Sequence, residues 1–400
     1  MNILHVIPSV APRYGGPSSA ILQECLALDA LGIGTLIVTT DADGAGRLRV
    51  DLDRVTTYSG VRTRFFSRVW SEAFKYSPQF ARWVRRHARE FDAVHIRGVL
   101  SHVCLAAAMA CRTAHVPYVM EPLGTLDCWS LAQKPWRKRV LLGAGGRRAL
   151  KGAVAIRCTS IEENRQVESL LGVKTGMVIP LAINAALMRA SADALAKRDQ
   201  DRYVLVLSRL HPVKGLELLI DAFAAATASD RTSARWRLVI AGNGEPEYVN
   251  KIRAHAGASP VAERIVFEGW VDGSRKSALL DGASLFALPS HHENFGMSLA
   301  EALACGVPAI ISPHVQLAET VAASGAGWVS ALTLDALSNT LREAMSSDGQ
   351  LAAKGQAARS LGQMFSSARV AQQLVELYDR VRLHPALTSS SLATAMTGIK

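Results

Sequence analysis

The sequence predicts an α/β protein of two domains, each built around a parallel sheet. Short apolar runs alternate with helical stretches along all 400 residues, which is typical of parallel α/β sheets. The chain is 49% hydrophobic and 20% charged, as expected for a folded core. An Ala-rich interval that ends in a run of charged residues interrupts the alternation. We therefore expect a first domain at 1–184, a linker at 185–202 and a second domain at 203–366.

The apolar runs place the strands of both domains. We expect first-domain strands at residues 2–8, 34–39, 92–96, 117–120 and 153–158, and second-domain strands at 203–208, 236–241, 264–268, 284–288, 308–311 and 326–329. A last helix at 367–383 is expected to cross back to the first domain, and the Ser/Thr/Ala-rich residues 384–400 to form a flexible tail. Because such sheets bind ligands at the carboxyl ends of their strands, the loops after the strands are the candidate sites.

The positive charge of the chain lies in its first half. Residues 1–200 hold 27 Lys and Arg against 16 Asp and Glu, which equals the net charge of +11 for the whole chain. Two segments, Arg62–Arg89 and Lys134–Lys151, mix basic residues with large aromatic ones. Such segments indicate a solvated basic face, an anionic membrane surface or an acidic partner. No nucleic-acid motif is present, so we expect no nucleic-acid partner.

Location follows from what the sequence lacks. It contains no run of 18 apolar residues, and it begins directly with a predicted strand where a secretory signal would have a basic segment. The six cysteines show no Cys-x-x-Cys spacing, which favours buried thiols in a reducing compartment. We expect a cytoplasmic protein, with peripheral attachment to the inner face of the cell membrane through the basic first domain.

The segment 290–308 carries the most specific signal. An apolar strand precedes it, and a helix is expected from about Phe295 to Cys305. Glu293 and Glu301 are eight residues apart, roughly 12 Å along a helix axis, against ~5–5.5 Å for the carboxylates of a retaining glycosidase. Between them, free N–H groups at Asn294, Phe295 and Gly296 would present the positive end of a helix to an anion. The pattern predicts a nucleotide-sugar site, the alternative being an amphipathic helix with solvated glutamates.

Glu293 and Glu301 together resemble the paired-glutamate motif of the retaining GT-B glycosyltransferases of family 4, the glycosyl transferases group 1. The resemblance implies two Rossmann-like domains facing each other across a cleft. It implies that Arg209 and Lys214 neutralise the departing nucleotide diphosphate, a large catalytic contribution in such reactions. Glu293 would contact the transferred sugar and Glu301 the ribose, with the N–H groups of Asn294 to Met297 nearby.

Further loops resemble donor-binding parts of the same family. Gly242 follows a predicted strand, in a turn where glycine lets the backbone approach a ligand, although a plain strand-to-helix turn explains it equally well. Val271 lies in the loop that reads the nucleotide base through its backbone in the family. In the first domain, Gly15 and Gly16 resemble the glycine-rich loop that closes over the donor phosphate and sugar.

Two loops after first-domain strands resemble the acceptor side of polysaccharide-assembly members. They supply His95, Arg97, Glu121 and Gly124 as acceptor-side residues. The sequence departs from a common pattern at Leu123, where many relatives carry a His or Arg. The usual Pro-Asn-Gly near the end of the first domain is also replaced, by Pro180-Leu181-Ala182. These departures admit an impaired enzyme.

The resemblance implies a retaining hexosyltransferase that uses a nucleotide-diphosphate sugar, GDP- or UDP-linked. The expected acceptor is a carbohydrate or a polyprenyl-diphosphate-linked sugar in bacterial exopolysaccharide or lipopolysaccharide assembly. No cofactor is expected, and no divalent metal, because the sequence places no Asp-x-Asp with helper ligands after a strand. The alternatives are a non-catalytic nucleotide-sugar-binding subunit and another GT-B enzyme, such as a sugar-nucleotide epimerase or a phosphorylase.

Overall fold

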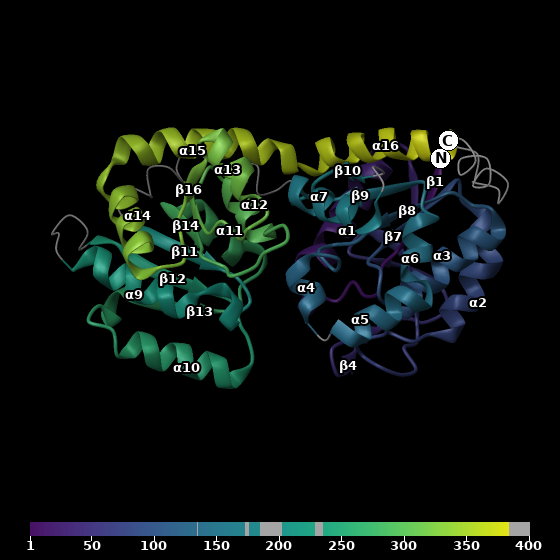
Figure 1. Cartoon of the computed structure of the whole chain (residues 1–400), viewed down its shortest axis with the longest axis horizontal. Helices are drawn as coiled ribbons and strands as arrows, with labels where there is room; N and C mark the ends of the chain where they lie inside the picture. Colours follow the sequence, from purple (N-terminus) through teal and green to yellow (C-terminus); the bar gives the residue numbers. More distant parts are fainter. Residues whose placement is uncertain (134, 173–175, 185–201, 229–234, 384–400) are drawn as a thin grey trace, which may run out of the picture. The chain divides into compact units, whose positions relative to one another are not determined.

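The computed structural model describes residues 1–133, 135–172, 176–184, 202–228 and 235–383 (Figure 1). Its contacts divide the chain into two units: Met1–Ala182 together with the segment that begins at Ser367, and Ile183–Ser366. Each unit is an α/β layer structure around a parallel sheet. Except for Arg202, the predicted linker lies outside the described residues, as does the predicted tail 384–400.

The first unit has an eight-stranded sheet in the order β10-β9-β8-β7-β1-β2-β6-β5, all parallel except the edge pair β5–β6. The strands are β1 (Asn2–Val6), β2 (Gly34–Thr40), β5 (Val55–Tyr58), β6 (Val61–Phe66), β7 (Ala93–Arg97), β8 (Tyr118–Glu121), β9 (Ala155–Cys158) and β10 (Gly176–Val178). A small hairpin, β3 (Ala42–Asp43) and β4 (Gly46–Arg47), stands apart. The five predicted strands are present, while β5, β6 and β10 were not predicted.

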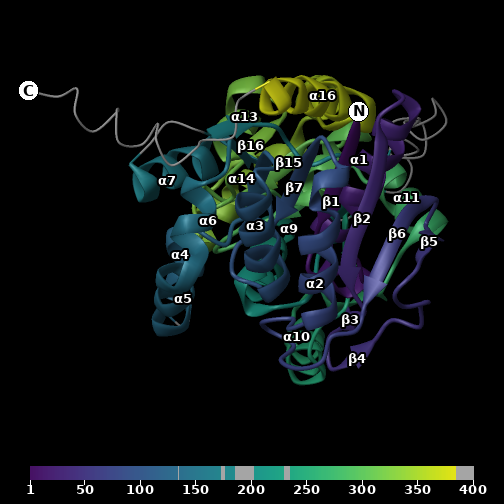
Figure 2. The ribbon, with the colours of Figure 1, turned by 90° about the vertical axis from the view of Figure 1, so that its right-hand side faces the viewer.

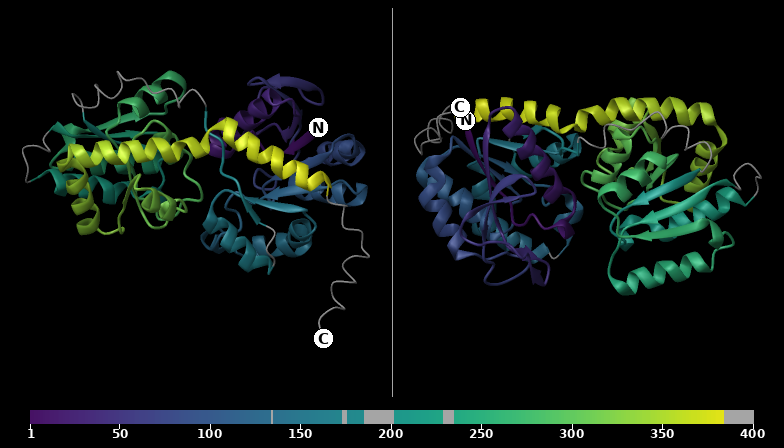
Figure 3. Two further views of the ribbon diagram at one scale, coloured as in Figure 1. Left: turned by 90° about the horizontal axis from the view of Figure 1, so that it is seen from above. Right: turned by 180° about the vertical axis from the view of Figure 1, so that it is seen from behind.

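Helices cover both faces of this sheet. Packed residues of α1 (Gly16–Ala30) and α16 (Ser367–Leu383) line one face, and Figure 3 shows α16 lying along this unit. The other face is covered by α2 (Pro78–His87), α3 (His102–Ala114), α6 (Arg147–Lys151) and α7 (Ile161–Leu171). Two short helices, α4 (Cys128–Ala132) and α5 (Pro135–Leu141), connect β8 to α6 through the π-helical turn η3 (Leu142–Gly146).

The second unit has a six-stranded parallel sheet in the order β13-β12-β11-β14-β15-β16. Its strands are β11 (Tyr203–Leu207), β12 (Arg237–Ala241), β13 (Ile265–Gly269), β14 (Leu285–Leu288), β15 (Ala309–Ile311) and β16 (Gly327–Val329). All six predicted strands are present, each within a residue of its predicted bounds. Chain order reverses at β11, so the loops after β11 and β14 leave the sheet side by side, the point where α/β sheets bind ligands.

The helices of the second unit are α9 (Leu216–Thr227), α10 (Pro246–Gly257), α11 (Gly273–Gly282), α12 (Met297–Ala304), α13 (Ala318–Ser324), α14 (Leu334–Ser346) and α15 (Asp348–Gly362). α9, α10 and α14 pack with the central strands into one core. The predicted helix from Phe295 is shorter than expected, since α12 begins at Met297.

Five cysteines (Cys25, Cys104, Cys111, Cys158 and Cys305) are buried free thiols, as predicted for them. In the described part of the chain, no helix combines the length and the apolar character that crossing a bilayer requires. The aromatic side chains of Arg62–Arg89 differ in burial: Phe65, Phe66 and Phe80 are buried, three others are partly exposed, and Trp70 is 70% exposed.

Candidate functional site

The loops after β11 and β14 are joined by an ion pair between two predicted site residues. Lys214 ends the 3-10 turn η5 (Pro212–Lys214) after β11, and its Nζ donates to Glu293 Oε2. The side chains are 13% and 20% exposed, so the pair is shielded but open to a ligand. The sheet order explains the meeting, because β11 and β14 are neighbours and their loops leave the same edge.

Glycine at position 215 is what lets these two loops touch. Gly215 has φ of 65°, and a Cβ there would lie 2.3 Å from the carbonyl oxygen of Pro289. The backbone N–H of His291 donates to the carbonyl of Val213 at 2.8 Å, which holds the loops in register. The lysine therefore reaches the glutamate from a fixed backbone.

The loop after β15 fixes the backbone of Glu293. Its N–H donates to the carbonyl of His314 at 3.2 Å, and its carbonyl accepts from the N–H of Gln316 at 3.0 Å. Glu293, on the loop after β14, therefore contacts the loops after β11 and β15 at the carboxyl edge of one sheet. Its backbone is fixed by hydrogen bonds, so a ligand can change the position of its side chain only.

The start of α12 differs from the prediction. Gly296 takes the left-handed conformation with φ of 78° and caps a helix that begins at Met297. The first free N–H groups of the helix are those of Gly296, Met297, Ser298 and Leu299, so Asn294 and Phe295 precede the helix. Because half of the Glu293–Glu301 interval is not helical, the predicted 12 Å axial separation does not apply.

Phe295 has a structural role. Its side chain is 3% exposed, and its ring meets that of Phe365 edge to face at 5.5 Å between centroids. This contact ties the turn before α12 to the 3-10 turn η8 (Gln363–Phe365). Because the side chain is buried, only the backbone of Phe295 could make the predicted contact with the donor.

Glu301 has a partner that the sequence analysis missed. Lys276 on α11 donates to Glu301 Oε1 at 2.6 Å, and the glutamate side chain is only 7% exposed. Burial raises the pKa of Glu301, and Lys276 opposes that rise. Twenty-five residues separate the two along the chain, so no local spacing could reveal the pair. The site thus contains two lysine–glutamate pairs.

The glycine turn after β12 is explained by packing inside the unit. Gly242 has φ of 138°, and a Cβ there would lie 1.8 Å from the carbonyl oxygen of Ser208. A Cβ on Gly244 would lie 2.0 Å from the carbonyl oxygen of Leu210, whose own N–H donates to Asn243 at 2.9 Å. The glycines let the loops after β11 and β12 lie backbone to backbone, so the predicted ligand approach is not required to explain them.

The remaining predicted residues of this unit follow neighbouring strands. Arg209 follows β11 and is exposed, and Val271 follows β13 and is partly exposed. With Gly242, Lys214 and Glu293, they lie on loops at the carboxyl edge of the sheet. The structure brings Lys214 and Glu293 into contact and leaves Arg209 on an exposed loop.

The glycine loop of the first unit is held by a tyrosine. Gly15 has φ of 78°, and Gly16 begins α1. Tyr14 donates to Glu72 and accepts from the N–H of Gly44 at 2.8 Å. Burial and the bond to Glu72 raise the pKa of Tyr14 to about 12, so it remains a neutral donor near neutral pH.

The predicted acceptor-side residues lie inside the first unit. The side chains of His95, Arg97 and Glu121 are all 0% exposed. His95 Nδ1 is 2.7 Å from the hydroxyl of Tyr378 on α16, and Arg97 donates to Glu24 on α1 at 2.5 Å. Burial lowers the pKa of His95, with Arg97 adding to the effect. These three side chains are therefore not accessible to an acceptor in this structure, in contrast to the prediction.

Gly124 is also inside the fold. Leu123 and Gly124 both have positive φ, 55° and 73°, and the Gly124 N–H donates to Glu163 Oε1 at 2.5 Å. The carboxylate of Glu163 also accepts from the N–H and hydroxyl of Thr159, at 2.7 and 2.8 Å. The loop geometry at Leu123 is therefore set by a buried glutamate on α7.

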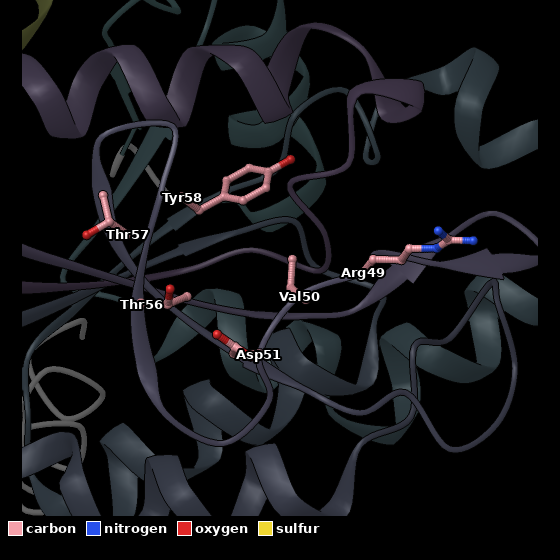
Figure 4. A pocket seen from close by; sticks show the side chains of 6 residues that line it. All are labelled: Arg49, Val50, Asp51, Thr56, Thr57 and Tyr58. Carbon is pink, nitrogen blue, oxygen red and sulfur yellow. The ribbon is translucent and has the colours of Figure 1, made fainter.

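An open pocket lies along the edge strand β5, and Figure 4 shows its lining. It is lined by Arg49, Val50, Asp51, Thr56, Thr57 and Tyr58. None of the predicted site residues contributes to it. Among the described residues, no three His, Cys, Asp or Glu side chains gather as a metal would require.

Two family models match the chain. The glycosyl transferases group 1 model matches residues 188–361, and the glycosyl transferase 4-like domain model matches residues 15–182. Their boundary falls near the division between the two units.

Characterised relatives match over part of the chain. Mannosylfructose-phosphate synthase of Agrobacterium fabrum is 28% identical over 202 residues, 48% of this chain and 44% of that protein. D-inositol 3-phosphate glycosyltransferase of Jonesia denitrificans is 26% identical over 207 residues, 49% of this chain and 47% of that protein. The matched region thus spans less than half of either relative.

Solved structures share the fold over nearly the whole chain. Sucrose-phosphate synthase from Thermosynechococcus elongatus has a TM-score of 0.77 at 21% identity, covering 95% of this chain and 98% of that one. Anabaena Alr3699/HepE in complex with UDP and glucose has a TM-score of 0.73 at 21% identity, covering 95% and 100%. These matches lead to one conclusion: the chain has the GT-B fold, with a glycosyl transferase 4-like domain at residues 15–182 and a glycosyl transferases group 1 domain at residues 188–361, and is a glycosyltransferase.

Proposed function

We propose that this glycosyltransferase is a retaining hexosyltransferase that takes its sugar from a UDP- or GDP-linked donor. The observation that carries the proposal is the pair of lysine–glutamate contacts, Lys214–Glu293, with Glu293 on the loop before α12, and Lys276–Glu301, with Glu301 on α12 itself. A diphosphate and two sets of sugar hydroxyls require cations, carboxylates and free N–H groups together. Anabaena HepE, which shares the fold, was solved with UDP-glucose.

In the proposed mechanism, the second unit stabilises the leaving group. Lys214 exchanges its contact with Glu293 for the donor diphosphate, assisted by Arg209 from its exposed loop. The N–H groups at Gly296 and Met297 add the positive end of α12. Charge on the departing phosphate is then met by groups already in place, the form of stabilisation that contributes most to catalysis.

The carboxylates orient the donor. Once Lys214 turns to the phosphate, Glu293 accepts hydrogen bonds from hydroxyls of the transferred sugar, and Glu301 accepts from the ribose. Glu293 is not the nucleophile in this proposal. The acceptor hydroxyl attacks from the face that the leaving group vacates, and the departing phosphate takes its proton, which retains the anomeric configuration. The proposal includes no metal and no cofactor.

For the acceptor we propose a glycan or a polyprenyl-diphosphate-linked sugar of bacterial exopolysaccharide or lipopolysaccharide assembly, met at the cytoplasmic face of the cell membrane. The net charge of +11, carried by the first half of the chain, supports an anionic surface as partner.

One observation favours a second candidate, a nucleotide-sugar-binding subunit without turnover. His95, Arg97 and Glu121, the side chains predicted to serve the acceptor, are buried among partners of their own unit. Such a subunit would bind the donor and never consume it. Hydrolysis or transfer of a radiolabelled donor separates the two candidates.

A thermal-shift screen against UDP, GDP, ADP and their sugar conjugates tests the donor site. We expect one nucleotide to raise the melting temperature of the wild type, and Lys214→Ala and Glu301→Ala to lose most of the shift. Lys251→Ala is the matched control, because Lys251 also pairs with a glutamate, Glu217 at 3.3 Å, but lies on the exposed surface of α10. Equal shifts in all three variants would contradict the proposed site.

A further inference from the structure

The two basic aromatic segments of the first unit differ in what they expose. In Arg62–Arg89 three aromatic rings are buried and three are partly exposed, and the exposed Trp70 has Arg68 and Lys75 as its basic neighbours in sequence. Both of these cations pair with Glu72, and their side chains are only 11% and 10% exposed. The basic residues nearest to Trp70 in sequence are therefore partly neutralised by Glu72.

The helix α5 presents the opposite arrangement. Trp136 and Val140 are 65% and 60% exposed and lie four residues apart, on one face of the helix. Arg137 and Arg139 are exposed on either side, and the Arg137 guanidinium lies 5.2 Å from the centre of the Trp136 ring. An apolar ridge with arginines along its margins results.

A lysine fastens this ridge to α4. Lys138 points away from the ridge and donates to the hydroxyl of Ser130 at 2.7 Å, as well as to the Ser130 carbonyl. Trp129, the neighbour of Ser130, is 43% exposed. Figure 2 shows α4 and α5 at the outer edge of the unit. We call Trp129, Trp136, Val140, Arg137 and Arg139 the α4–α5 surface.

Positive charge continues beyond this surface without opposition. No Asp or Glu occurs in the sequence from Lys134 to Lys151, and Arg147 and Arg148 of α6 are exposed. Within the described residues, none of the arginines at 137, 139, 147 and 148 is paired with a carboxylate. Unpaired arginines beside exposed tryptophans are the combination that binds the interface of an anionic bilayer.

We propose that the α4–α5 surface docks on an anionic lipid bilayer, with the two tryptophans and Val140 entering the interfacial region and the arginines binding lipid phosphates. An aliphatic side chain beside the aromatic one fits an acyl boundary, whereas single-stranded nucleic acid is bound by stacked aromatic platforms. The inference rests on the proposed membrane-linked acceptor for its biological use only, because docking is measured without any donor or acceptor.

Charge reversal at matched positions tests the location. Full-length protein is sedimented with vesicles of phosphatidylcholine, alone or mixed with phosphatidylglycerol. We expect binding to the mixed vesicles only, and Arg137→Glu/Arg139→Glu to weaken it at least about tenfold. Arg82→Glu/Arg85→Glu on α2 changes the charge equally at exposed positions that have no exposed tryptophan beside them, and we expect a loss of less than about threefold.

Insertion is tested separately from charge. Vesicles with brominated acyl chains quench tryptophans that enter the bilayer, and we expect quenching of wild-type emission. In Trp129→Phe/Trp136→Phe the apolar character is kept, so binding should persist while the quenching falls. Trp136→Ala/Val140→Ala should weaken binding at constant charge.

Three results would overturn the docking surface: an equal loss from the α2 reversal, unchanged quenching in the phenylalanine variant, or displacement from vesicles by an oligonucleotide at equal phosphate concentration. Each variant is also tested for its melting temperature and its donor-induced thermal shift. Loss of vesicle binding with an intact donor shift assigns the defect to docking. Vesicle binding without any donor shift would instead count against the proposed function and leave the docking surface standing.

Discussion

Replacement of Glu24 by Gln should strongly destabilise the first unit. Glu24 on α1 is 0% exposed and accepts from Arg97 at 2.5 Å and from two nitrogens of Arg157 at 2.8 Å each. Glu121 completes a cluster of two buried arginines and two buried glutamates. Gln keeps the shape of Glu24 but cannot balance an arginine, so the variant leaves a net positive charge in the core.

Two routes give the magnitude. Burial alone raises the pKa of Glu24, but attraction by Arg157 and Arg97 outweighs it and lowers that pKa from 4.5 to about 2. At 1.36 kcal/mol per unit, this corresponds to about 3 kcal/mol in favour of the folded state. Removal of one member of a buried ion pair costs about 3–5 kcal/mol by mutation. We therefore expect Glu24→Gln to cost about 3–5 kcal/mol.

Calorimetry and urea unfolding measure the effect. For a unit of this size we expect the melting transition to fall by about 10 °C. Glu162→Gln is the control, since its contact with Arg165 is 3.6 Å long and exposed, and should cost less than about 0.5 kcal/mol. Glu24→Gln/Arg157→Met restores neutrality and should recover part of the loss. A Glu24→Gln protein within about 0.5 kcal/mol of the wild type would refute the reasoning.

The sign of the pH dependence follows from the same carboxylate. Because the folded pKa lies below the unfolded one, the contribution of Glu24 is fully present above about pH 4.5 and is lost as the pH falls toward 2. The wild type should therefore lose more stability than Glu24→Gln across this interval. Parallel acid-unfolding curves for the two proteins would contradict the assignment.

Three further results are expected. Gly242→Ala places a Cβ 1.8 Å from the Ser208 carbonyl and should cost about 2 kcal/mol or more in urea unfolding, whereas Gly257→Ala, with nothing within 4 Å, should cost less than about 0.5. Lys276→Met should raise the pKa of Glu301 further, so that donor affinity measured by calorimetry falls at a higher pH than in the wild type, and coincident profiles would exclude this role. Turnover measured in the presence of EDTA should equal that without it, and loss of turnover would contradict the proposal of a metal-independent reaction.

The paired contacts suggest how the donor site is held before a ligand arrives. Lys214–Glu293 and Lys276–Glu301 each join two loops or helices that are distant in sequence. The polar groups proposed to bind the donor thus satisfy each other in its absence, which limits the cost of keeping them shielded. Donor binding would exchange one set of charge-assisted bonds for another.

The sequence by itself determined the strands of both sheets that are apolar throughout, because a strand buried on both faces leaves a continuous hydrophobic run. It did not reveal β6, Val-Arg-Thr-Arg-Phe-Phe, because two arginines interrupt the hydrophobic run although Phe65 and Phe66 are buried on opposite faces of the sheet. The candidate site residues Lys214 and Glu293 were predicted from motif and spacing, and the structure shows them in contact because each follows a buried strand of the same sheet.

Only the tertiary structure decided which polar residues are exposed. His95, Arg97 and Glu121 lie near the carboxyl ends of strands, the position from which Lys214 and Glu293 were also predicted. Unlike those two, they are covered by α1 and α16. Glu24, Arg157 and Tyr378 complete that cluster, and the contact between Tyr378 and His95 joins residues 283 positions apart. Lys276 likewise reaches Glu301 across the fold. The local sequence is enough to predict strands and turns, whereas the burial of a polar side chain depends on which distant helix packs over that face of the sheet.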